Sequence, residues 1–562
     1  MKKLLFSLAV LPGALAMAQV GVNTDKPRSS LDVAYIKGAD PATPQGVHFP
    51  NVSTEQRLKF ENVSEGMMIY NTDKKCLEMY LGDGSGSHEW QCIPNVGSES
   101  SQRVSVSPAT FGGQFIGGVA LSGASVSFKI TNNGFSPIDV DFSNAVTVEN
   151  ERGNITVNGD AHKGVSLKGG ASKTLTYQLS GTPQAGTLTA RFNQSGLSAD
   201  QQITVDKGNA NLQNQEHYIV SLAHSSTPIQ GLIENNQVSI SIPYTGGKGS
   251  YDAVSITQTT APGQGGATKK ITLSIPAGNF GVQGELTATL NVEGGGRYPV
   301  RQLPAGESYN IATYNIDING STSKVIIKGI GGIPDRMFGK MTNGQLRHQF
   351  VYLPVTVTGA GGYNKTWLNY NLGAEFAKLG ENFKPQQQLF GRAAHDDDKT
   401  HGSLYQWQRA SDGHELRNVQ TTSTQASNWR NAGSSAFITG SSNWVRNGEN
   451  ATGSDLLLWR AGGVNNPCPS GYHVPTVQEW QQLLNAIGSN GMYTQTKLPN
   501  LAAAGSHRYD NGSLYGKGSY GEYWSSSANV SSSAHYMHFY SGYSSTNIDS
   551  RAYGGSVRCL KD

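Results

Sequence analysis

Alternation of hydrophobic and polar positions dominates the middle of the chain. Short β-branched segments recur at spacings of roughly ten residues between Arg103 and Asp206. They read ASVSFKITN, NAVTVEN, GNITVNG, KTLTYQLSG, GTLTARF and QQITVD. A period of two, interrupted by Gly, Asn and Pro, is typical of an antiparallel β-sandwich. The pattern therefore predicts a chain that is mostly β.

A second set of alternating segments follows the first. It reads HYIVSLA, QVSISIPYTGG, DAVSITQ, KKITLSIPAG and GELTATLNV. The segment Gly186–Phe192 (GTLTARF) resembles Gly284–Leu290 (GELTATL), so we predict two related immunoglobulin-like β-sandwiches, at residues 103–206 and 207–304. Residues 305–360 contain SKVIIKGIGG and QFVYLPVTVTGAGG, and we interpret them as a connector.

The composition changes after residue 360, where seven of the eight tryptophans lie. We therefore predict a separate domain over residues 361–562, in which Gly/Ser/Asn-rich loops surround short aromatic strands. One helix is predicted to begin at Thr476, because Thr476 and Glu479 have the spacing of a capping box. Its apolar face is formed by Trp480, Leu483, Leu484 and Ile487.

The first eighteen residues have the pattern of a signal peptide. Lys2 and Lys3 precede an apolar run, and Ala16 and Ala18 occupy the positions of a cleavage site before Gln19. The run is too short for a comfortable membrane span, so we expect export without a transmembrane span. The near balance of 43 Lys+Arg against 40 Asp+Glu gives no broad reason to bind nucleic acid. We predict a protein at the cell surface, associated with the outer membrane, or extracellular.

Four cysteines in an exported chain suggest disulfides. Cys76 and Cys92 flank the Gly-rich turn LGDGSGSHEW in an N-terminal β region, residues 19–102, where a hairpin would bring them together. Cys468 and Cys559 lie in the last hundred residues. Pairing within each set is the simplest of the three connectivities that four cysteines allow. A cysteine-rich metal site is the alternative, but no C-x-x-C spacing supports it.

Two regions resemble known families. The N-terminal segment QVGVNTDKPRSSLDV resembles the start of many exported surface proteins of the Bacteroidetes. Five ordered motifs in residues 361–562 resemble the Fibrobacter succinogenes major paralogous domain. These motifs are TWLNYNLGA, GSLYQWQRASDGHE, CPSGYHVPTVQEWQQLL, GEYWSSS and GGSVRCLKD.

The second resemblance implies a C-type-lectin-like α+β fold, similar also to formylglycine-generating enzymes, with a Cys468–Cys559 bridge. Those enzymes depend on active-site cysteines, whereas both C-terminal cysteines here are expected in a structural bridge. Ser525–Ser527 with His535 could be imagined as nucleophile and base, but the sequence does not fix their geometry. We therefore assign no catalytic residue and expect the protein not to be an enzyme.

Two groups of residues are candidates for ligand binding. Asp396, Asp397 and Asp398 could hold Ca²⁺, which prefers oxygen ligands, although solvated aspartates are the simpler interpretation and the sugar-binding motif of Ca²⁺-dependent lectins is missing. We otherwise expect no cofactor. The second group consists of tyrosines in Ser- and Gly-rich segments, which are typical of surfaces that bind proteins or glycans by shape. Its members are Tyr509, Tyr515, Tyr540 and Tyr543.

These observations favour an exported adhesion or recognition protein. The β-sandwiches would form a stalk, and the C-terminal domain would bind a glycan or a surface protein without catalysis. A cell-envelope enzyme related in fold to formylglycine-generating enzymes is one alternative. A structural subunit of a surface appendage is the other.

Overall fold

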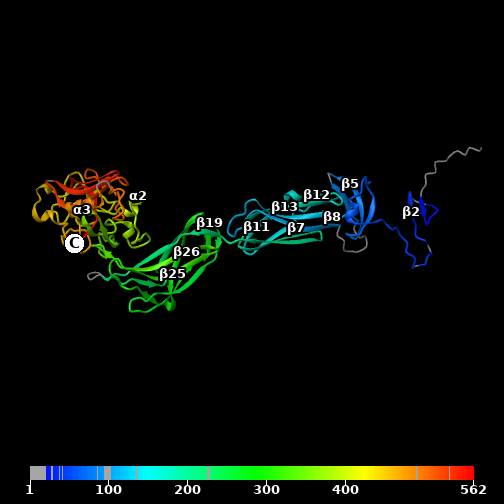
Figure 1. Ribbon diagram of the computed structural model, residues 1–562, viewed down its shortest axis with the longest axis horizontal. Coiled ribbons are helices and arrows are strands. Elements are labelled where there is room, and N and C mark those ends of the chain that lie inside the picture. Colours follow the sequence, from blue (N-terminus) through cyan, green and yellow to red (C-terminus); the bar gives the residue numbers. More distant parts are fainter. Residues whose placement is uncertain are drawn as a thin grey trace, which may run out of the picture. The chain divides into compact units, whose positions relative to one another are not determined.

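The fold is described from a computed structural model of the chain. It describes residues 20–26, 29–36, 38–40, 42–84, 87–93, 103–134, 137–223, 228–342, 344–488, 491–530 and 532–562. The predicted signal peptide lies outside these residues. The chain divides into two compact units, of which one contains residues up to 115 with 120–205 and the other contains 116–119 with 206–562. Both are built mainly of β-strands (Figure 1).

The first unit begins with two small sheets. Strands β1 and β2 pair in parallel, and the next sheet has the order β3-β4-β5-β6. The elements are β1 (Val20–Val22), β2 (Leu31–Val33), β3 (Asn51–Val52), α1 (Thr54–Arg57), β4 (Met68–Asn71), β5 (Cys76–Gly84) and β6 (Ser87–Cys92). The predicted Cys76–Cys92 disulfide is present and joins β5 to β6.

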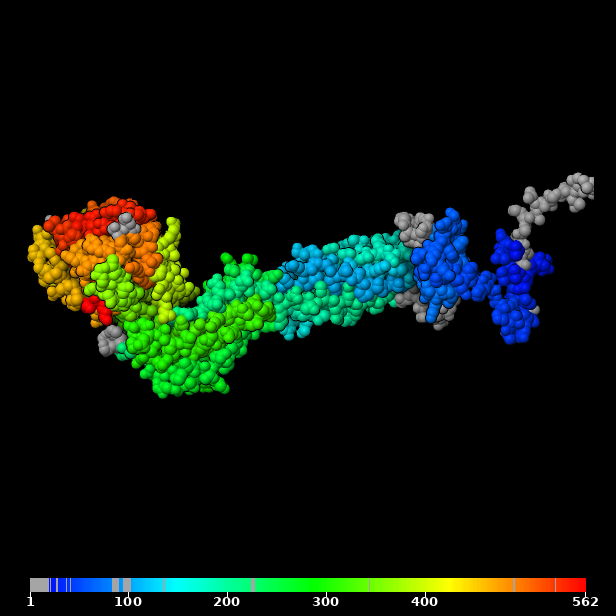
Figure 2. Space-filling model, viewed as in Figure 1, coloured from blue at the N-terminus to red at the C-terminus, as the bar shows by residue number. Residues whose placement is uncertain are grey.

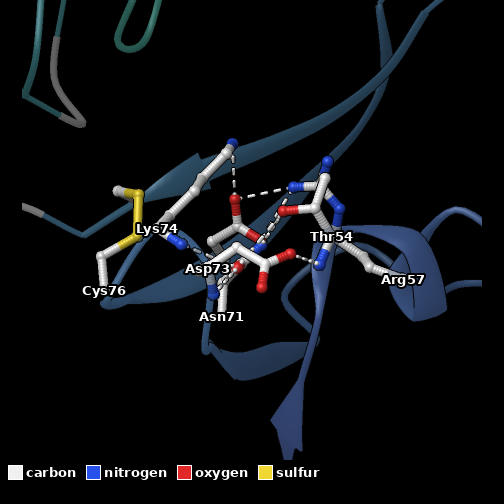
Figure 3. Close-up of a disulfide and its surroundings, with 8 residues drawn as sticks. Thr54, Arg57, Asn71, Asp73, Lys74 and Cys76 are labelled. Atoms are coloured by element: carbon white, nitrogen blue, oxygen red, sulfur yellow. Dashed lines mark hydrogen bonds and ion pairs between the residues drawn. A yellow bond between two sulfur atoms is a disulfide. The ribbon is translucent and has the colours of Figure 1, made fainter.

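A buried carboxylate lies beside this disulfide. Glu78 is fully buried and accepts hydrogen bonds from Arg57 at 2.6 and 2.8 Å, from Lys74 at 2.8 Å and from Asn71 at 2.8 Å. Burial alone would raise the pKa of Glu78, but these hydrogen bonds outweigh it and lower the pKa. Arg57, Asn71 and Lys74 converge beside the bridge in Figure 3. Through Glu78, these bonds join α1 and β4 to β5.

The remainder of the first unit is a module of two main sheets around one apolar core. The sheets have the orders β11-β13-β8-β7 and β10-β14-β15, and β9 pairs with β12. The elements are β7 (Val104–Gly112), β8 (Ala124–Asn132), β9 (Ile138–Val140), β10 (Val146–Asn150), β11 (Asn154–Asn158), η1 (Asp160–His162), β12 (Val165–Leu167), β13 (Ser172–Thr182), β14 (Gly186–Gln194) and β15 (Leu197–Val205). Alternate residues of β8, β13 and β14 fill the core, as the period of two predicts. We call this the first module.

The second module opens the second unit. Its sheets have the orders β16-β19-β23-β21-β20 and β17-β26-β25, with β22 on β19 and a small β18-β24 pair. The elements are β16 (Asn209–Leu212), β17 (Gln215–Val220), β18 (Leu232–Glu234), β19 (Ser239–Tyr251), β20 (Val254–Thr259), β21 (Lys270–Ile275), β22 (Gly278–Phe280), β23 (Gln283–Val292), η2 (Glu293–Gly295), β24 (Arg297–Pro299), β25 (Ser308–Ile318) and β26 (Ser321–Ile330).

The expected connector over residues 305–360 is not a separate linker in the structure. Strand β25 contributes Tyr314 and Ile316 to the same core as Ile242 of β19, so the second module continues past residue 304 to β26. Ile333 and Tyr352 already belong to the core of the C-terminal domain. The alternation of β25 supplies the physical reason, because its buried side chains need the facing sheet as a partner.

The C-terminal domain contains many short elements. Its main sheet has the order β36-β35-β40-β37-β38-β39 with β31 on β40, and a second sheet has the order β29-β30-β41-β34. The strands are β27 (Ile333–Pro334), β28 (Val351–Tyr352), β29 (Pro354–Thr358), β30 (Asn364–Leu368), β31 (Leu404–Gln406), β32 (Thr421–Thr422), β33 (Phe437–Ile438), β34 (Tyr472–His473), β35 (Ser506–His507), β36 (Leu514–Tyr515), β37 (Gly521–Ala528), β38 (Ser533–Tyr540), β39 (Tyr543–Ser550), β40 (Gly554–Ser556) and β41 (Leu560–Lys561). The helical elements are η3 (Ala360–Gly362), η4 (Glu375–Ala377), α2 (Arg392–Asp396), η5 (Asp398–Thr400), η6 (Gly448–Asn450), η7 (Gly453–Leu456) and α3 (Val477–Ile487).

The predicted helix is confirmed as α3. Thr476 is its N-cap, and the capping box with Glu479 is formed in both directions. Trp480, Leu483 and Leu484 are buried, as the apolar spacing predicts. The Cys468–Cys559 disulfide is also present, and it joins the segment before α3 to the segment before the last strand.

Candidate binding face of the C-terminal domain

Helix α3 covers one face of the sheet formed by β37, β38 and β39. Trp480 of α3 shares a core with Tyr523 of β37 and with Met537 and Phe539 of β38. The Trp480 indole also donates a hydrogen bond of 3.1 Å to the backbone carbonyl of Trp524. Since side chains alternate along a strand, their neighbours in sequence point to the opposite face. In Figure 2 the red residues of the last strands lie at the surface of this domain.

The opposite face is rich in rings. The register pairs Trp524 with Tyr536 across β37 and β38, and it pairs Tyr540 with Tyr543 across β38 and β39. Tyr536, His538 and Tyr540 occupy every second position of β38, so all three point to this face.

The rings form a continuous row that extends beyond the sheet. Neighbouring ring centroids are 5.7 Å apart for Tyr515 and Tyr520, 5.5 Å for Tyr520 and Tyr540, and 5.2 Å for Tyr540 and Tyr543. The row continues through His538 to Tyr536 with separations of 5.4 and 5.5 Å. All these distances are typical of paired aromatic rings. We call these six residues the ring row.

Part of the ring row is open to solvent. Tyr515 is 49% exposed, Tyr543 is 44% exposed and Tyr540 is 37% exposed. The loop that carries Tyr520 turns at Gly516, whose φ of 69° favours glycine and where a Cβ atom would lie 2.7 Å from the Tyr520 ring. Gly516 therefore lets the loop bring the Tyr520 ring against its own backbone.

A small crevice lies at the Tyr536 end of the ring row. Its volume is about 10 Å³, and Glu522, Asp549, Trp524, Tyr536 and Tyr553 contribute to its lining. This space holds about one water molecule, so a larger ligand would lie over the face instead of entering it. Tyr509 packs on Tyr553 of this lining, with ring centroids 5.2 Å apart, and is not part of the ring row.

Ionisable side chains of this face have shifted pKa values. Burial raises the pKa of Asp549 to about 6, and the neighbouring Glu522 carboxylate adds to the shift. Burial also raises the pKa of Glu522. The pKa of His538 is lowered by burial, and its Nε2 atom is buried without a hydrogen-bond partner among the described residues. The face thus combines rings with polar groups that are partly removed from water.

The sequence identified some of these residues and missed others. Tyr515, Tyr540 and Tyr543 lie together in the ring row, and Tyr509 lies apart from them beside Tyr553. The alternation in the segment HYMHFY could have added Tyr536 and His538. Tyr520, Glu522 and Asp549 join the face only through the register of β37 to β39 and the loop before them.

Two regions of the chain match family models. Residues 363–561 match the family model of the Fibrobacter succinogenes major domain. This match agrees with the resemblance found in the sequence and covers the whole ring row. Residues 20–105 match the family model described as a phage tail like trimerisation region.

Comparisons with whole proteins add little. A search of curated proteins found no match. One solved structure, of the surface layer protein SbsC, domains 1–6, is similar at 11% sequence identity with a TM-score of 0.14. The match covers 59% of this chain and 44% of that structure.

The three carboxylates of the aspartate run in the C-terminal domain have separate partners. Asp396 lies 2.9 Å from Arg392, the Asp397 carboxylate accepts from the Lys399 backbone at 3.0 Å, and Asp398 pairs with Lys517. Each carboxylate therefore has its own protein partner, and a shared Ca²⁺ ion at this run stays a prediction.

Two other groups of metal-ligating residue types are close together in the described part of the chain. Cys76, Glu78 and Cys92 form one group, but its thiols are joined in the disulfide. In the second group, the Gln406 backbone N–H donates to His414 Nε2 at 3.0 Å. The His414 proton therefore lies on Nδ1, 2.8 Å from Asp412. The thiols of the first group are therefore closed to a metal ion, and in the second group both nitrogens of His414 already have protein partners.

Among the residues that the structure describes, no helix combines the length and apolar character that a membrane crossing requires.

Proposed function

We propose that this is an exported surface protein whose C-terminal domain recognises a glycan at the ring row, without catalysis. The observation that carries the proposal is the continuity of the row. Six rings from β36, β38, β39 and one loop adjoin one another on a sheet face that α3 leaves uncovered. The two sandwich-like modules would serve as its stalk.

The chemistry of the face suits a sugar. A pyranose ring has an apolar C–H face and a polar edge, and tyrosine has an apolar ring with a hydroxyl group at its tip. Asp549 and Glu522 lie beside the rings and supply carboxyl groups for hydrogen bonds to sugar hydroxyls. The small volume of the crevice favours a ligand that lies along the row, as an oligosaccharide would.

A non-catalytic role is favoured by the state of the candidate nucleophiles. Cys468 and Cys559 are joined, so neither thiol is available for the chemistry of formylglycine-generating enzymes. Ser525 is fully buried, and its hydroxyl donates to the backbone carbonyl of His535 at 2.8 Å, not to the imidazole ring.

A glycan array probed with the mature full-length chain, with and without Ca²⁺, tests the proposal. We expect binding that Tyr540→Ala and Tyr543→Ala each weaken at least about tenfold, since each removes a ring from the row. Ile548→Ala is the matched control, because Ile548 is exposed on the same strand but points to the other face. No glycan binding, or equal loss in the control, would contradict the proposal. A protein ligand captured in place of a glycan would replace the ligand class, and Ca²⁺ dependence would direct attention to Asp396–Asp398.

We also propose that the chain assembles as a trimer through residues 20–105. The match to a trimerisation region suggests this, and an independent observation favours it. Large apolar side chains are unusually exposed here, which marks an interaction surface. They include Val20, Val22, Leu31, Val33, Tyr35, Ile36, Val47, Leu58, Phe60, Met67 and Tyr70. The three-residue parallel pair β1-β2 also needs further packing to be stable.

Analytical ultracentrifugation of the mature chain measures the assembly. We expect a trimer, and we expect Leu31→Glu with Leu58→Glu to yield monomers, because the two side chains are 58% and 74% exposed in the single chain. Val282→Glu is the control, since Val282 is 80% exposed in the second module. A monomeric wild-type chain would refute trimerisation, and larger polymers would instead favour a subunit of a surface appendage.

A further inference from the structure

A second concave region of the C-terminal domain shares no residue with the ring row. It is a hollow of about 430 Å³, within the size range of sites for small molecules. Its lining is mostly polar and charged. It includes Arg347, Lys378, Arg417, Glu375, Asp398 and Ser403.

The acidic residues of this hollow already have basic partners. Glu375 lies 3.6 Å from Lys378, and Asp398 pairs with Lys517. In the described part of the chain, no carboxylate lies within ion-pair distance of the guanidinium of Arg347 or Arg417. Among the described residues, the two arginines are therefore the basic side chains of the lining that have no ion-pair partner.

Arg417 is held in place by neutral groups. Its Nε donates to the Gly402 carbonyl at 2.6 Å and its Nη2 donates to the Ala504 carbonyl at 3.1 Å, whereas Nη1 is buried without a partner among the described residues. Burial lowers the pKa of Arg417 to about 10, against the attraction of Asp398. A partly buried guanidinium that has no ion-pair partner, and that leaves one of its N–H groups unbonded, is well placed to bind an anion. Arg347 likewise has a buried Nε without a partner in the described chain.

The backbone segments that carry the arginines are joined by a buried contact. His348 Nε2 lies 3.2 Å from Glu415 Oε1, and both side chains are almost completely buried. Glu415 also accepts a hydrogen bond of 2.9 Å from the Gly413 backbone, which fixes the turn before Arg417. Arg347 and Arg417 are distant in sequence, but their neighbours hold them on one hollow, which is therefore organised before any ligand arrives.

Two glycines allow two segments of the wall to pack closely against each other. A Cβ atom at Gly373 would lie 2.1 Å from the Ser403 hydroxyl, and one at Gly402 would lie 2.5 Å from the Leu372 carbonyl. Both have positive φ, 77° and 73°, so any other residue would strain the wall. The Gly402 carbonyl of this wall is the one that accepts from Arg417 Nε.

We propose that this hollow binds an oxyanion group, a carboxylate or a phosphate or sulfate, through Arg347 and Arg417. Planar guanidinium groups match the paired oxygens of these anions and bind them with charge-assisted hydrogen bonds. The bound anion would supply the ion-pair partner that both arginines lack among the described residues. The proposal is independent of the ring row and holds whether or not that face binds glycans.

Titration calorimetry on the mature full-length chain tests it with four probes: glucuronate, inorganic phosphate, inorganic sulfate and uncharged glucose. We expect at least one anion to bind and glucose not to bind at this site. Glucuronate binding alone would indicate an acidic sugar as the source of the anion. Phosphate or sulfate binding without glucuronate would indicate an ester group. No heat from any anion at concentrations up to about 10 mM would overturn the proposal.

Variants of the two arginines test whether the anion binds in the hollow. We expect Arg347→Gln to weaken the bound anion about tenfold or more, and Arg347→Lys, which keeps the charge but loses the fork, to weaken it less. Arg417 also supports the fold through its hydrogen bonds. A loss of affinity in Arg417→Gln therefore counts as evidence for the site only if the variant keeps the melting temperature of the wild-type chain. The exposed Arg430→Gln is the matched control in the same domain. Unchanged affinity in Arg347→Gln, or equal loss in Arg430→Gln, would overturn the assignment.

Discussion

The first module and the C-terminal domain differ in the kinds of side chain that they bury. The first module buries alternate apolar side chains between two sheets, with Val126, Leu175 and Leu188 at its centre. The C-terminal domain also buries charged side chains completely, among them Arg558 and Glu415, together with most of the tryptophans.

The length of the strands explains this difference. Long paired strands satisfy the backbone by themselves, whereas strands of two or three residues leave many loop groups without a ladder partner. In the C-terminal domain side chains provide the missing bonds. Gln406, for example, donates to the carbonyls of Ile438 and Ala552 at 2.7 and 2.8 Å. Loops fixed in this way can present binding groups at defined positions, which the modules do not need to do.

The largest expected effect comes from the long disulfide. Cys468–Cys559 closes a separation of 91 residues and Cys76–Cys92 one of 16, so the chain-entropy model assigns about 4–5 and about 3 kcal/mol to them. Urea unfolding followed by tryptophan fluorescence measures the C-terminal domain almost alone, because seven of the eight tryptophans lie there. We expect Cys468→Ala/Cys559→Ala to shift this transition strongly and Cys76→Ala/Cys92→Ala to leave it in place. Equal shifts would show that the two regions unfold together.

The second prediction concerns a buried arginine. Arg558 donates to Asn371 at 3.1 Å and to the Asn500 carbonyl at 3.2 Å, and it also donates to the Pro499 carbonyl. Arg558→Met would leave these acceptors unpaired, at an expected cost of about 3 kcal/mol in the free energy of unfolding. Arg430→Met, at an exposed site, should change it by less than about 0.5 kcal/mol. Similar values for both variants would argue against side-chain bonds as the support of these loops.

The third prediction is a pH dependence at the start of α3. His473 lies 2.7 Å from Asp562 and 3.2 Å from Glu479. Burial opposes the charge on His473, but the two carboxylates outweigh it and raise its pKa, while the pKa of Glu479 falls to about 2 despite burial. The His473 contribution is complete below about pH 6.5 and is lost as the pH rises through the raised pKa. The Glu479 contribution is complete above about pH 4.5 and is lost as the pH falls toward 2.

Stability from this pair should therefore be greatest between about pH 4.5 and 6.5. We expect His473→Gln to flatten the pH profile of the melting temperature and to cost about 1–2 kcal/mol near pH 5.5. Glu149→Gln in the first module is the control, because its contact with Arg191 is solvent-exposed and should contribute little at any pH. A profile that keeps its shape in His473→Gln would exclude this pair as its source.

Much of the fold could be predicted from the sequence because its signals are local. A period of two identified the strands of the modules, and the Thr476–Glu479 spacing identified α3. Strand β25 was missed although it alternates, and the strand-like segment of β26 was assigned to a connector. The position of both strands depends on the parallel pairing of β26 with β17 and on a core shared with β19, both far away in sequence.

The candidate sites were less predictable, since they depend on register and long-range contacts. The tyrosines of β38 and β39 were recognisable as a group, but Tyr520 and Asp549 join them only through the folded sheet. Arg347 and Arg417 carry no shared sequence signal. They are brought together by the contact between His348 and Glu415, which no periodicity reveals.

The smallest effect on stability is expected at the ring row. A variant there shows whether the rings serve ligand binding or the packing of the domain. Tyr543 is 44% exposed and touches only the neighbouring rings Tyr540 and His538 among the ring contacts of the described residues. Tyr543→Ser should therefore change the free energy of unfolding by less than about 0.5 kcal/mol. The same variant should lose most of any ligand binding at this face. A loss of stability as large as that of Arg558→Met would instead mean that the ring row supports the fold of the C-terminal domain, as its buried side chains do, and is not a face left for recognition.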